Sequence, residues 1–275
     1  MLSNIIQERT ALHSGGEPFY EISTPTVKQV VRNHFDCQTL SGARLSAPTM
    51  PINPDNDIDQ QCSLFDLDLR FHFDEDMTSI SQNADAAHRI TPLSLALLED
   101  SSWYVPDFAA AKTPSFGRGA GCGFVESSCI TGGNVPDYSR GYFCNSPNVL
   151  GVRSGCDYTH HNKAGCDLET DASPPERQQY FSEPEYGAKF DDVHYCPMRS
   201  KYLVPCHDGK ASSSSWSHSA LHLLRQLTGE SFEENSRCFE TDVNIPVCLE
   251  AICDPKDKTL SIVVEGKTFY CAYHG

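Results

Sequence analysis

The sequence has 275 residues, enough for one large domain or two ordinary ones with a real hydrophobic core. It carries 37 acidic and 21 basic residues, a net charge of −16, and no stretch gathers Lys or Arg into a basic stripe. Because neutralising a phosphate backbone needs such a stripe, a nucleic acid is not an expected partner. No run approaches the ~20 apolar residues of a membrane span, so no transmembrane segment is expected either.

The thirteen cysteines show no paired CxxC spacing of the zinc-ribbon kind. Disulfides are the better interpretation, and they indicate an oxidising compartment, so we expect an extracellular or cell-surface location. The first residues, MLSNIIQERTALH, contain no apolar core of a signal peptide. A chain of secreted type without an export signal suggests a front end that is not in this sequence.

Two helices are predicted near the start of the chain, each opened by Thr-Pro, in which the threonine is the N-cap. The first, TPTVKQVVRNHF, has Thr24 as its cap and an apolar stripe at helical spacing. The second, TPLSLALLEDSSWY, has Thr91 as its cap and leucines at 93, 95, 97 and 98. These leucines leave only Ser94 and the Glu99–Asp100 end exposed, so this helix is expected to pack on more than one side.

Residues 46–66 are rich in Pro, Asn and Asp, which predicts an irregular surface loop. From about residue 113 onward, Gly, Pro, Ser and Cys become frequent and long helical patterns disappear. We expect a module of loops and short strands there, held by disulfides. SHSALHLLRQL at 217–227 is the exception and predicts a short helix.

Two catalytic or binding motifs are imitated in the sequence but not completed. None of the eleven histidines is followed by Glu, so the HExxH helix of zinc peptidases is absent; His218 and His222 imitate its spacing but with Ser where the general base belongs. The Gly-rich GRGAGCGF at 117–124 lacks the Gly-Lys-Ser/Thr of a phosphate loop, and a tight turn beside a cystine is preferred.

Several stretches together resemble one family. ISTPTVKQVVRNHFDC (22–37), ITPLSLALLEDSSWYVPDF (90–108), FGRGAGCGFVESSC (116–129), QYFSEPEYG with HYCPM (179–187, 194–198) and SRCF (236–239) occur in the order seen in leishmanolysin-like zinc metallopeptidases of the metzincin group. The resemblance covers nearly the whole chain.

The resemblance gives a meaning to DLDLRFHFDEDMT at 66–78. The family has its third zinc-binding histidine in H-W-E-x-R and, eleven residues later, the Met-turn methionine in D/N-E-x-M-T. Met77 matches the methionine, with an ordinary core methionine as the alternative. Asp66 stands where the histidine is expected, while Asp68 and Arg70 match the glutamate and arginine. Asp66 or His72 is a candidate zinc ligand, and a third possibility is that neither binds the metal.

The family's HExxH helix precedes the first Thr-Pro helix by several dozen residues and is absent from this sequence. The resemblance therefore implies an α+β fold: residues 1–112 as a remnant of the metzincin catalytic domain with its Met-turn, and residues 113–275 as a Cys-rich C-terminal domain. The implied function is zinc metalloendopeptidase activity on polypeptide substrates in the complete protein, with this piece a fragment or degenerate member that is inactive and holds no catalytic zinc. The alternative is a non-catalytic secreted or surface module for binding or adhesion.

Twelve of the cysteines are expected to form six disulfides, with Cys62 left over. On the resemblance, Cys37–Cys122 ties the helical part to the start of the Cys-rich part. The connectivity of the remaining ten is left open. These candidates are Cys129, Cys144, Cys156, Cys166, Cys196, Cys206, Cys238, Cys248, Cys253 and Cys271.

Overall fold

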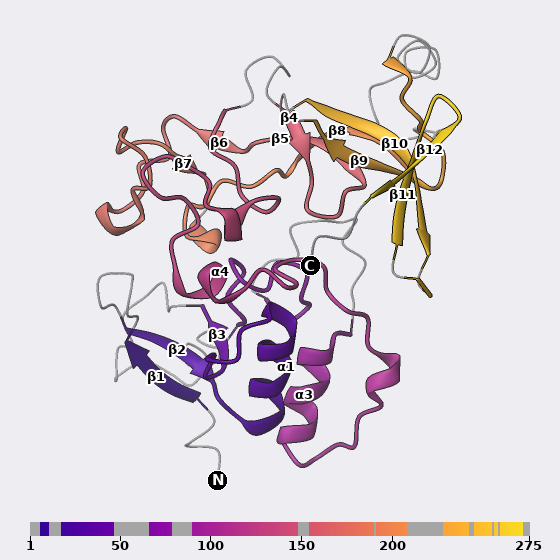
Figure 1. Cartoon of the computed structure of the whole chain (residues 1–275). Helices are drawn as coiled ribbons and strands as arrows, with labels where there is room; N and C mark the ends of the chain where they lie inside the picture. The colour runs from indigo at the N-terminus through magenta and orange to yellow at the C-terminus, as the bar shows by residue number, and fades with distance from the viewer. Residues whose placement is uncertain are drawn as a thin grey trace. The chain divides into compact units, whose positions relative to one another are not determined.

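The structure is a computed structural model of the whole chain (Figure 1). It describes residues 6–10, 18–46, 66–78, 90–147, 154–189, 191–207, 228–241, 245–254, 256–257 and 259–271. The interior of the predicted loop 46–66, including Cys62, and the predicted helix 217–227 with His218 and His222 lie outside this part. The few helices, several small sheets and five disulfides agree with the expected α+β class, whereas the metzincin assignment stays a prediction.

The chain folds into two compact units, each made of two segments. The first comprises Met1–Arg140 and Thr170–Cys196, and the second comprises Gly141–Glu169 and Pro197–Gly275. These units are defined by spatial contacts and each combines two segments, whereas the expected domains, 1–112 and 113–275, are each continuous in the sequence. The expected domains stay a prediction.

Both predicted helices are present in the first unit and lie side by side (Figure 1): α1 spans Pro25–Phe35 and α3 spans Pro92–Asp100. In α1, Val27, Val31 and Phe35 are buried, as the periodicity predicted. In α3, however, Leu98 is exposed, so the expectation of exposure only at Ser94 and at the Glu99–Asp100 end was wrong. Leu98 falls outside the surface that α3 buries, which is formed by Leu93, Leu95 and Ala96.

The two helices differ in how their first N–H groups are satisfied. The Thr91 side chain accepts from Ser94 N (3.2 Å), which confirms it as the N-cap of α3. Thr24 occupies the cap position of α1 but makes no side-chain cap bond. Asp100, at the end of α3, instead accepts from Thr26 N (2.9 Å) and Val27 N (3.0 Å), and its negative charge suits the positive end of the α1 dipole.

A small antiparallel sheet has the strand order β1-β2-β3, with β1 (Ile6–Thr10), β2 (Pro18–Ile22) and β3 (Ala43–Leu45). The strands β1 and β2 come before α1 in the chain, and β3 comes after it. Sequence analysis did not predict these strands. Gly42 lies next to the sheet, where a Cβ would come within 2.3 Å of the Ile22 carbonyl oxygen, so no larger residue fits beside β2.

The Gly-rich segment 117–124 is a turn followed by α4 (Cys122–Glu126). Its N–H groups at Gly119 and Gly121 donate to the carbonyls of His34 (2.8 Å) and Phe35 (2.7 Å), which are the last carbonyls of α1. Both N–H groups therefore cap the C-terminus of α1. Neither Gly119 N–H nor Gly121 N–H is free to bind a phosphate. The preferred interpretation, a tight turn beside the Cys37–Cys122 disulfide, is confirmed.

The first unit also contains short pieces that connect these elements. They are β7 (Gly187–Ala188) and the 3₁₀ turns η1 (Phe108–Ala110), η2 (Asp137–Ser139), η3 (Glu176–Gln178) and η4 (Asp191–Val193).

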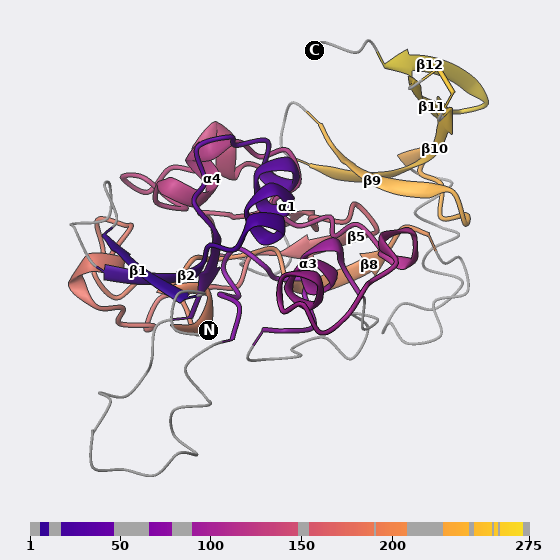
Figure 2. The ribbon, with the colours of Figure 1, turned by 90° about the horizontal axis from the view of Figure 1, so that it is seen from below.

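The second unit consists of strands. One antiparallel sheet has the order β4-β5-β8: β4 (Ser154–Cys156), β5 (Asn162–Gly165) and β8 (Lys201–Pro205). The other has the order β12-β11-β10-β9: β9 (Ser236–Glu240), β10 (Pro246–Asp254), β11 (Thr259–Val264) and β12 (Lys267–Cys271), with β12 at a free edge (Figure 2). β6 (Leu168–Glu169) is a two-residue strand.

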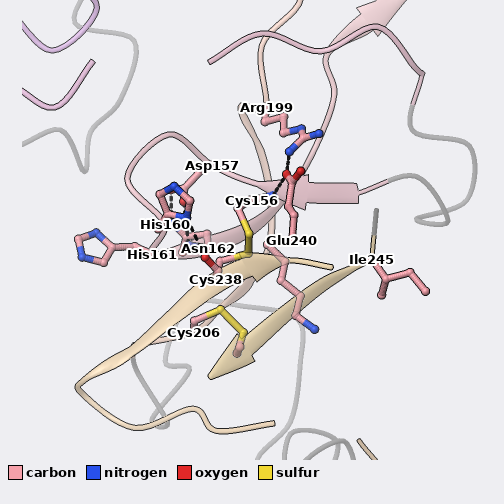
Figure 3. The surroundings of a disulfide bond; sticks show 12 residues. Cys156, Asp157, His160, His161, Asn162, Arg199, Cys206, Cys238, Glu240 and Ile245 are labelled. Carbon is pink, nitrogen blue, oxygen red and sulfur yellow. Dashed lines mark hydrogen bonds and ion pairs between the residues drawn. A yellow bond between two sulfur atoms is a disulfide. The ribbon is translucent and has the colours of Figure 1, made fainter. Parts of the chain in front are cut away.

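The core of the second unit is built largely from half-cystines. Cys156, Cys206, Cys238 and Cys248 cluster with Val204 and Phe232. Figure 3 shows the Cys156–Cys238 bridge, where His160 Nδ1–H donates to the Cys238 carbonyl (2.8 Å) and Glu240 accepts from Cys156 N (3.0 Å). Disulfides here take the place that larger apolar side chains hold in an ordinary core.

Five of the six expected disulfides are present. Besides Cys37–Cys122 they are Cys129–Cys196, Cys144–Cys166, Cys156–Cys238 and Cys206–Cys248. Cys253 and Cys271 are free and exposed, so the expectation of six bridges was wrong. Both pair with Leu260 in the ladder, from opposite sides of β11, and are thus two strands apart, roughly 10 Å. A disulfide needs Cα atoms within about 7 Å.

No helix in the described part of the chain is long and apolar enough to cross a lipid bilayer.

Candidate functional site

Residues 66–78 form a loop whose two ends lie side by side. The Leu67 N–H donates to the Met77 carbonyl (2.9 Å), and Leu67 also forms a parallel β-bridge with Thr78. Leu67 is 1% exposed, so this closure lies in the protein interior. Asp66 and Met77 are therefore brought to adjacent ends of one closed loop, although eleven positions separate them in the sequence.

The side chain of Met77 is 47% exposed, whereas the alternative of an ordinary core methionine expects a buried side chain. Its place at the end of the closed loop is compatible with the role of a Met-turn floor, which stays a prediction. Asp66, at the first position of the loop, is half-buried.

The described residues do not fit a complete zinc site. Among them, no three His, Cys, Asp or Glu side chains lie close enough together to share a metal ion. His72 is buried, and its ring lies 5.9 Å from that of Phe35 in the core. Asp66 and His72 as zinc ligands stay predictions.

The middle of the loop is held by the buried carboxylate of Asp68, which lies against a histidine. The Asp68 carboxylate is 4% exposed, lies 3.0 Å from His194 Nε2, and also accepts from Arg70 N (3.0 Å). Burial alone would raise the pKa of Asp68, but His194 and Arg70 together outweigh it and hold this pKa below its usual value. The carboxylate therefore stays ionised and fixes the loop.

Arg70 is buried as well and anchors the same loop on another side. Its Nη2 donates to the Ser127 carbonyl (2.6 Å), and its guanidinium lies 4.5 Å from the centre of the Phe71 ring. Both charged residues face protein groups, so the arrangement positions the loop and presents neither group for acid–base chemistry.

Sequence reasoning missed the role of His194. The histidine belongs to the HYCPM stretch, and the Tyr180 hydroxyl donates to its carbonyl (3.1 Å). The adjacent Cys196 is bridged to Cys129, which holds this segment in the first unit. Its occurrence within a family-like stretch was visible in the sequence, but nothing there indicated Asp68 as its partner.

Glu75 ties the loop to the start of α3. Its carboxylate, on a side chain that is buried, accepts from the hydroxyls of Thr91 and Ser94 (3.2 Å for Ser94). Burial raises the pKa of Glu75 to about 7, and the two hydroxyl donors offset only part of this effect. Thr91 thus has two roles, as a helix cap and as a donor to the loop.

A family model described as Leishmanolysin matches residues 5–275. The chain is similar to a leishmanolysin homolog of Crithidia fasciculata, with 26% identity over 259 residues that cover 90% of this chain and 36% of that protein. It is also similar to leishmanolysin of Leishmania major, with 27% identity over 199 residues covering 68% of this chain and 31% of the relative.

An animal relative shows the same relation. The leishmanolysin-like peptidase of Drosophila melanogaster is 26% identical over 236 residues, which cover 79% of this chain and 32% of that protein. The chain therefore spans about a third of the length of the curated relatives that it matches.

Proposed function

Because the chain belongs to the leishmanolysin family of peptidases, we propose that it is part of a zinc metalloendopeptidase in which residues 66–78 form the Met-turn. The observation that carries the proposal is the closed loop: the Leu67 N–H donates to the Met77 carbonyl, so that the exposed, apolar Met77 ends the loop that Asp66 begins.

Within this proposal, the contribution of these residues is structural. Asp68, Arg70 and Glu75 hold the loop from three sides, so that its ends keep a fixed position. These 275 residues contain no HExxH, and thus supply neither its two histidines nor its glutamate. The proposed activity, hydrolysis of peptide bonds in polypeptide substrates, belongs to the complete protein.

We also propose an extracellular or surface location. Five disulfides in the described part of the chain are compatible with an oxidising compartment and not with the reducing cytosol.

One observation favours the alternative of a non-catalytic binding or adhesion module. Asp66 stands where the family resemblance places the third zinc-binding histidine, and loss of that ligand would leave the scaffold without its metal.

The test uses protein captured from cells with an antibody against the 275-residue chain. The proposal expects peptides containing HExxH in the captured protein, one zinc per molecule, and casein cleavage that a chelator abolishes. Captured protein without zinc and without cleavage would contradict the peptidase and support the module.

A substitution at Asp66 then tests the ligand assignment. Asp66→Ala in the complete protein is expected to weaken zinc binding at least tenfold. Asp76→Ala, at an exposed aspartate of the same loop, is the matched control and should leave zinc binding unchanged. Equal zinc affinity in both variants would show that Asp66 is not a ligand.

A further inference from the structure

The outer edge of the four-stranded sheet in the second unit is the strand β12 (Figure 2). All of its residues are exposed, and they include Phe269 (51% exposed) and Tyr270 (81% exposed). Within the described part of the chain, β12 pairs with β11 alone, and the register between the two strands has no shift. An exposed, regular edge strand with apolar side chains is a template on which another strand can pair.

The turn between β11 and β12 fixes the hydrogen-bond pattern of this edge. Val264 pairs with Lys267, and the two residues between them, Glu265 and Gly266, have φ values of 49° and 75°. Positive φ at both central positions identifies a type I′ hairpin turn. In this turn the two flanking residues, Val264 and Lys267, form a hydrogen-bonded pair.

The backbone groups of β12 therefore divide into two sets. Because hydrogen-bonded and non-hydrogen-bonded pairs alternate along an antiparallel ladder, Lys267, Phe269 and Cys271 bond to β11. The N–H and C=O groups of Thr268 and Tyr270 point the other way, to the open edge. Both residues thus offer a donor and an acceptor to a further strand, and no strand of the described part pairs with them.

A second copy of β12, running antiparallel, matches this edge when both strands are centred on Phe269. Thr268 of each copy then lies opposite Tyr270 of the other, and each such pair exchanges two N–H···O bonds. Phe269 lies opposite its own counterpart and Lys267 lies opposite Cys271, so no two like charges meet. Aromatic pairs, and pairs of an aromatic with a β-branched residue, stabilise neighbouring strands. The sequence of β12 is therefore complementary to itself.

We propose that β12 is a dimerisation edge, at which two copies of this chain join their sheets by antiparallel pairing centred on Phe269. A second copy fits because a two-fold axis through Phe269 brings the outward donors of each strand to the acceptors of the other. The dimer is weak, since a strand of five residues buries little surface and the net charge of −16 repels an identical chain. It is independent of the proposed peptidase activity, which involves the first unit.

Sedimentation equilibrium of the disulfide-bonded chain of 275 residues measures this association. We expect a reversible monomer–dimer equilibrium with a Kd of roughly 10–100 µM, which becomes tighter as salt screens the net charge. A chain that stays monomeric over this range would overturn the proposal and leave the edge to an extended segment of another protein. A dimer that persists in non-reducing SDS electrophoresis would also overturn it, because free cysteines would then hold the copies together.

Thr268→Pro tests the backbone pairing. Proline removes an N–H that points to the open edge, so the β11–β12 ladder keeps its bonds while the pairing between copies loses one at each Thr268. Dimerisation should weaken at least tenfold, with little change in the urea midpoint of unfolding. Thr268→Val keeps the N–H and the β-branched shape, so this control should leave the Kd unchanged. Equal weakening by both variants would contradict pairing through the backbone.

Substitutions at Phe269 test the register. Phe269→Lys and Phe269→Glu each place like charges opposite one another on the two-fold axis, so each variant by itself should dimerise about tenfold more weakly. An equal mixture of the two variants places opposite charges there and should associate about tenfold more tightly than either variant alone. Ile252→Lys, at an exposed residue of β10 inside the same sheet, is the control and should dimerise like the wild type. A mixture no tighter than the separate variants, or equal weakening by Ile252→Lys, would overturn the proposal.

Discussion

Replacing Glu75 by Gln should make the first unit more stable at pH 8 than the wild type. Glu75 is buried between the 66–78 loop and α3, where its oxygens accept from the Thr91 and Ser94 hydroxyls. Glutamine has the same shape; its oxygen can accept from one hydroxyl and its amide can donate to the other. The substitution therefore removes the charge while keeping the hydrogen bonds.

The magnitude follows from the pKa of Glu75, which burial raises from 4.5 to about 7. A raised pKa in the folded state stabilises the fold at pH values below 4.5, and this stability is lost as the pH rises to 7. This difference in pKa between the unfolded and the folded state corresponds to about 3 kcal/mol. The glutamine variant does not titrate, so its advantage over the wild type should grow by about 3 kcal/mol between pH 4.5 and pH 8.

Urea unfolding followed by far-ultraviolet circular dichroism at 222 nm measures this difference. The helices α1, α3 and α4, which contribute to this signal, lie in the first unit. His72, whose pKa is lowered to about 3 by burial, changes stability in the opposite sense with pH. Its contribution cancels, since both proteins contain it.

The matched control is Glu99→Gln, at an exposed glutamate of α3. Its difference from the wild type should vary much less over the same pH range. If the advantage of Glu75→Gln is the same at pH 4.5 and pH 8, the burial argument for Glu75 is refuted.

Three further predictions concern the anchors of the fold. Asp68→Ala leaves His194 without its partner and should lower the free energy of unfolding by about 2 kcal/mol in the same urea assay, whereas an unchanged value would contradict a buried hydrogen bond to this carboxylate. Asp100→Ala should cost about 1 kcal/mol and speed amide hydrogen exchange in the first turn of α1, and unaltered exchange would argue against this cap. Of the cysteines in the described part, Cys253 and Cys271 alone should react with iodoacetamide under native conditions, as read by peptide mass spectrometry; their protection would show that they are bridged.

Local features of this protein were predictable from the sequence because they depend on neighbouring residues. Thr91 followed by Pro predicted the start of α3, and the spacing of Val27, Val31 and Phe35 predicted the buried face of α1. The family was recognised from ordered stretches along the chain, and the Cys37–Cys122 pairing that this resemblance implied is confirmed.

Only the tertiary structure decided which distant side chains meet. Asp100 caps α1 from 74 positions away in place of Thr24, and His194 reaches Asp68 through a segment that returns to the first unit. The periodicity of α3 could not show that Leu98 is exposed. Exposure depends on what packs against a helix face, and charge pairing depends on distance in space; neither quantity is a function of local sequence.

The cysteines show both sides of this division. Their number and the absence of paired spacings determined that the chain is held by disulfides. Which ones remain free was decided by the sheet, because the pairing of both Cys253 and Cys271 with Leu260 places β11 between them. Strand register sets the distance between two sulfur atoms, and a bond between them requires that distance to be short.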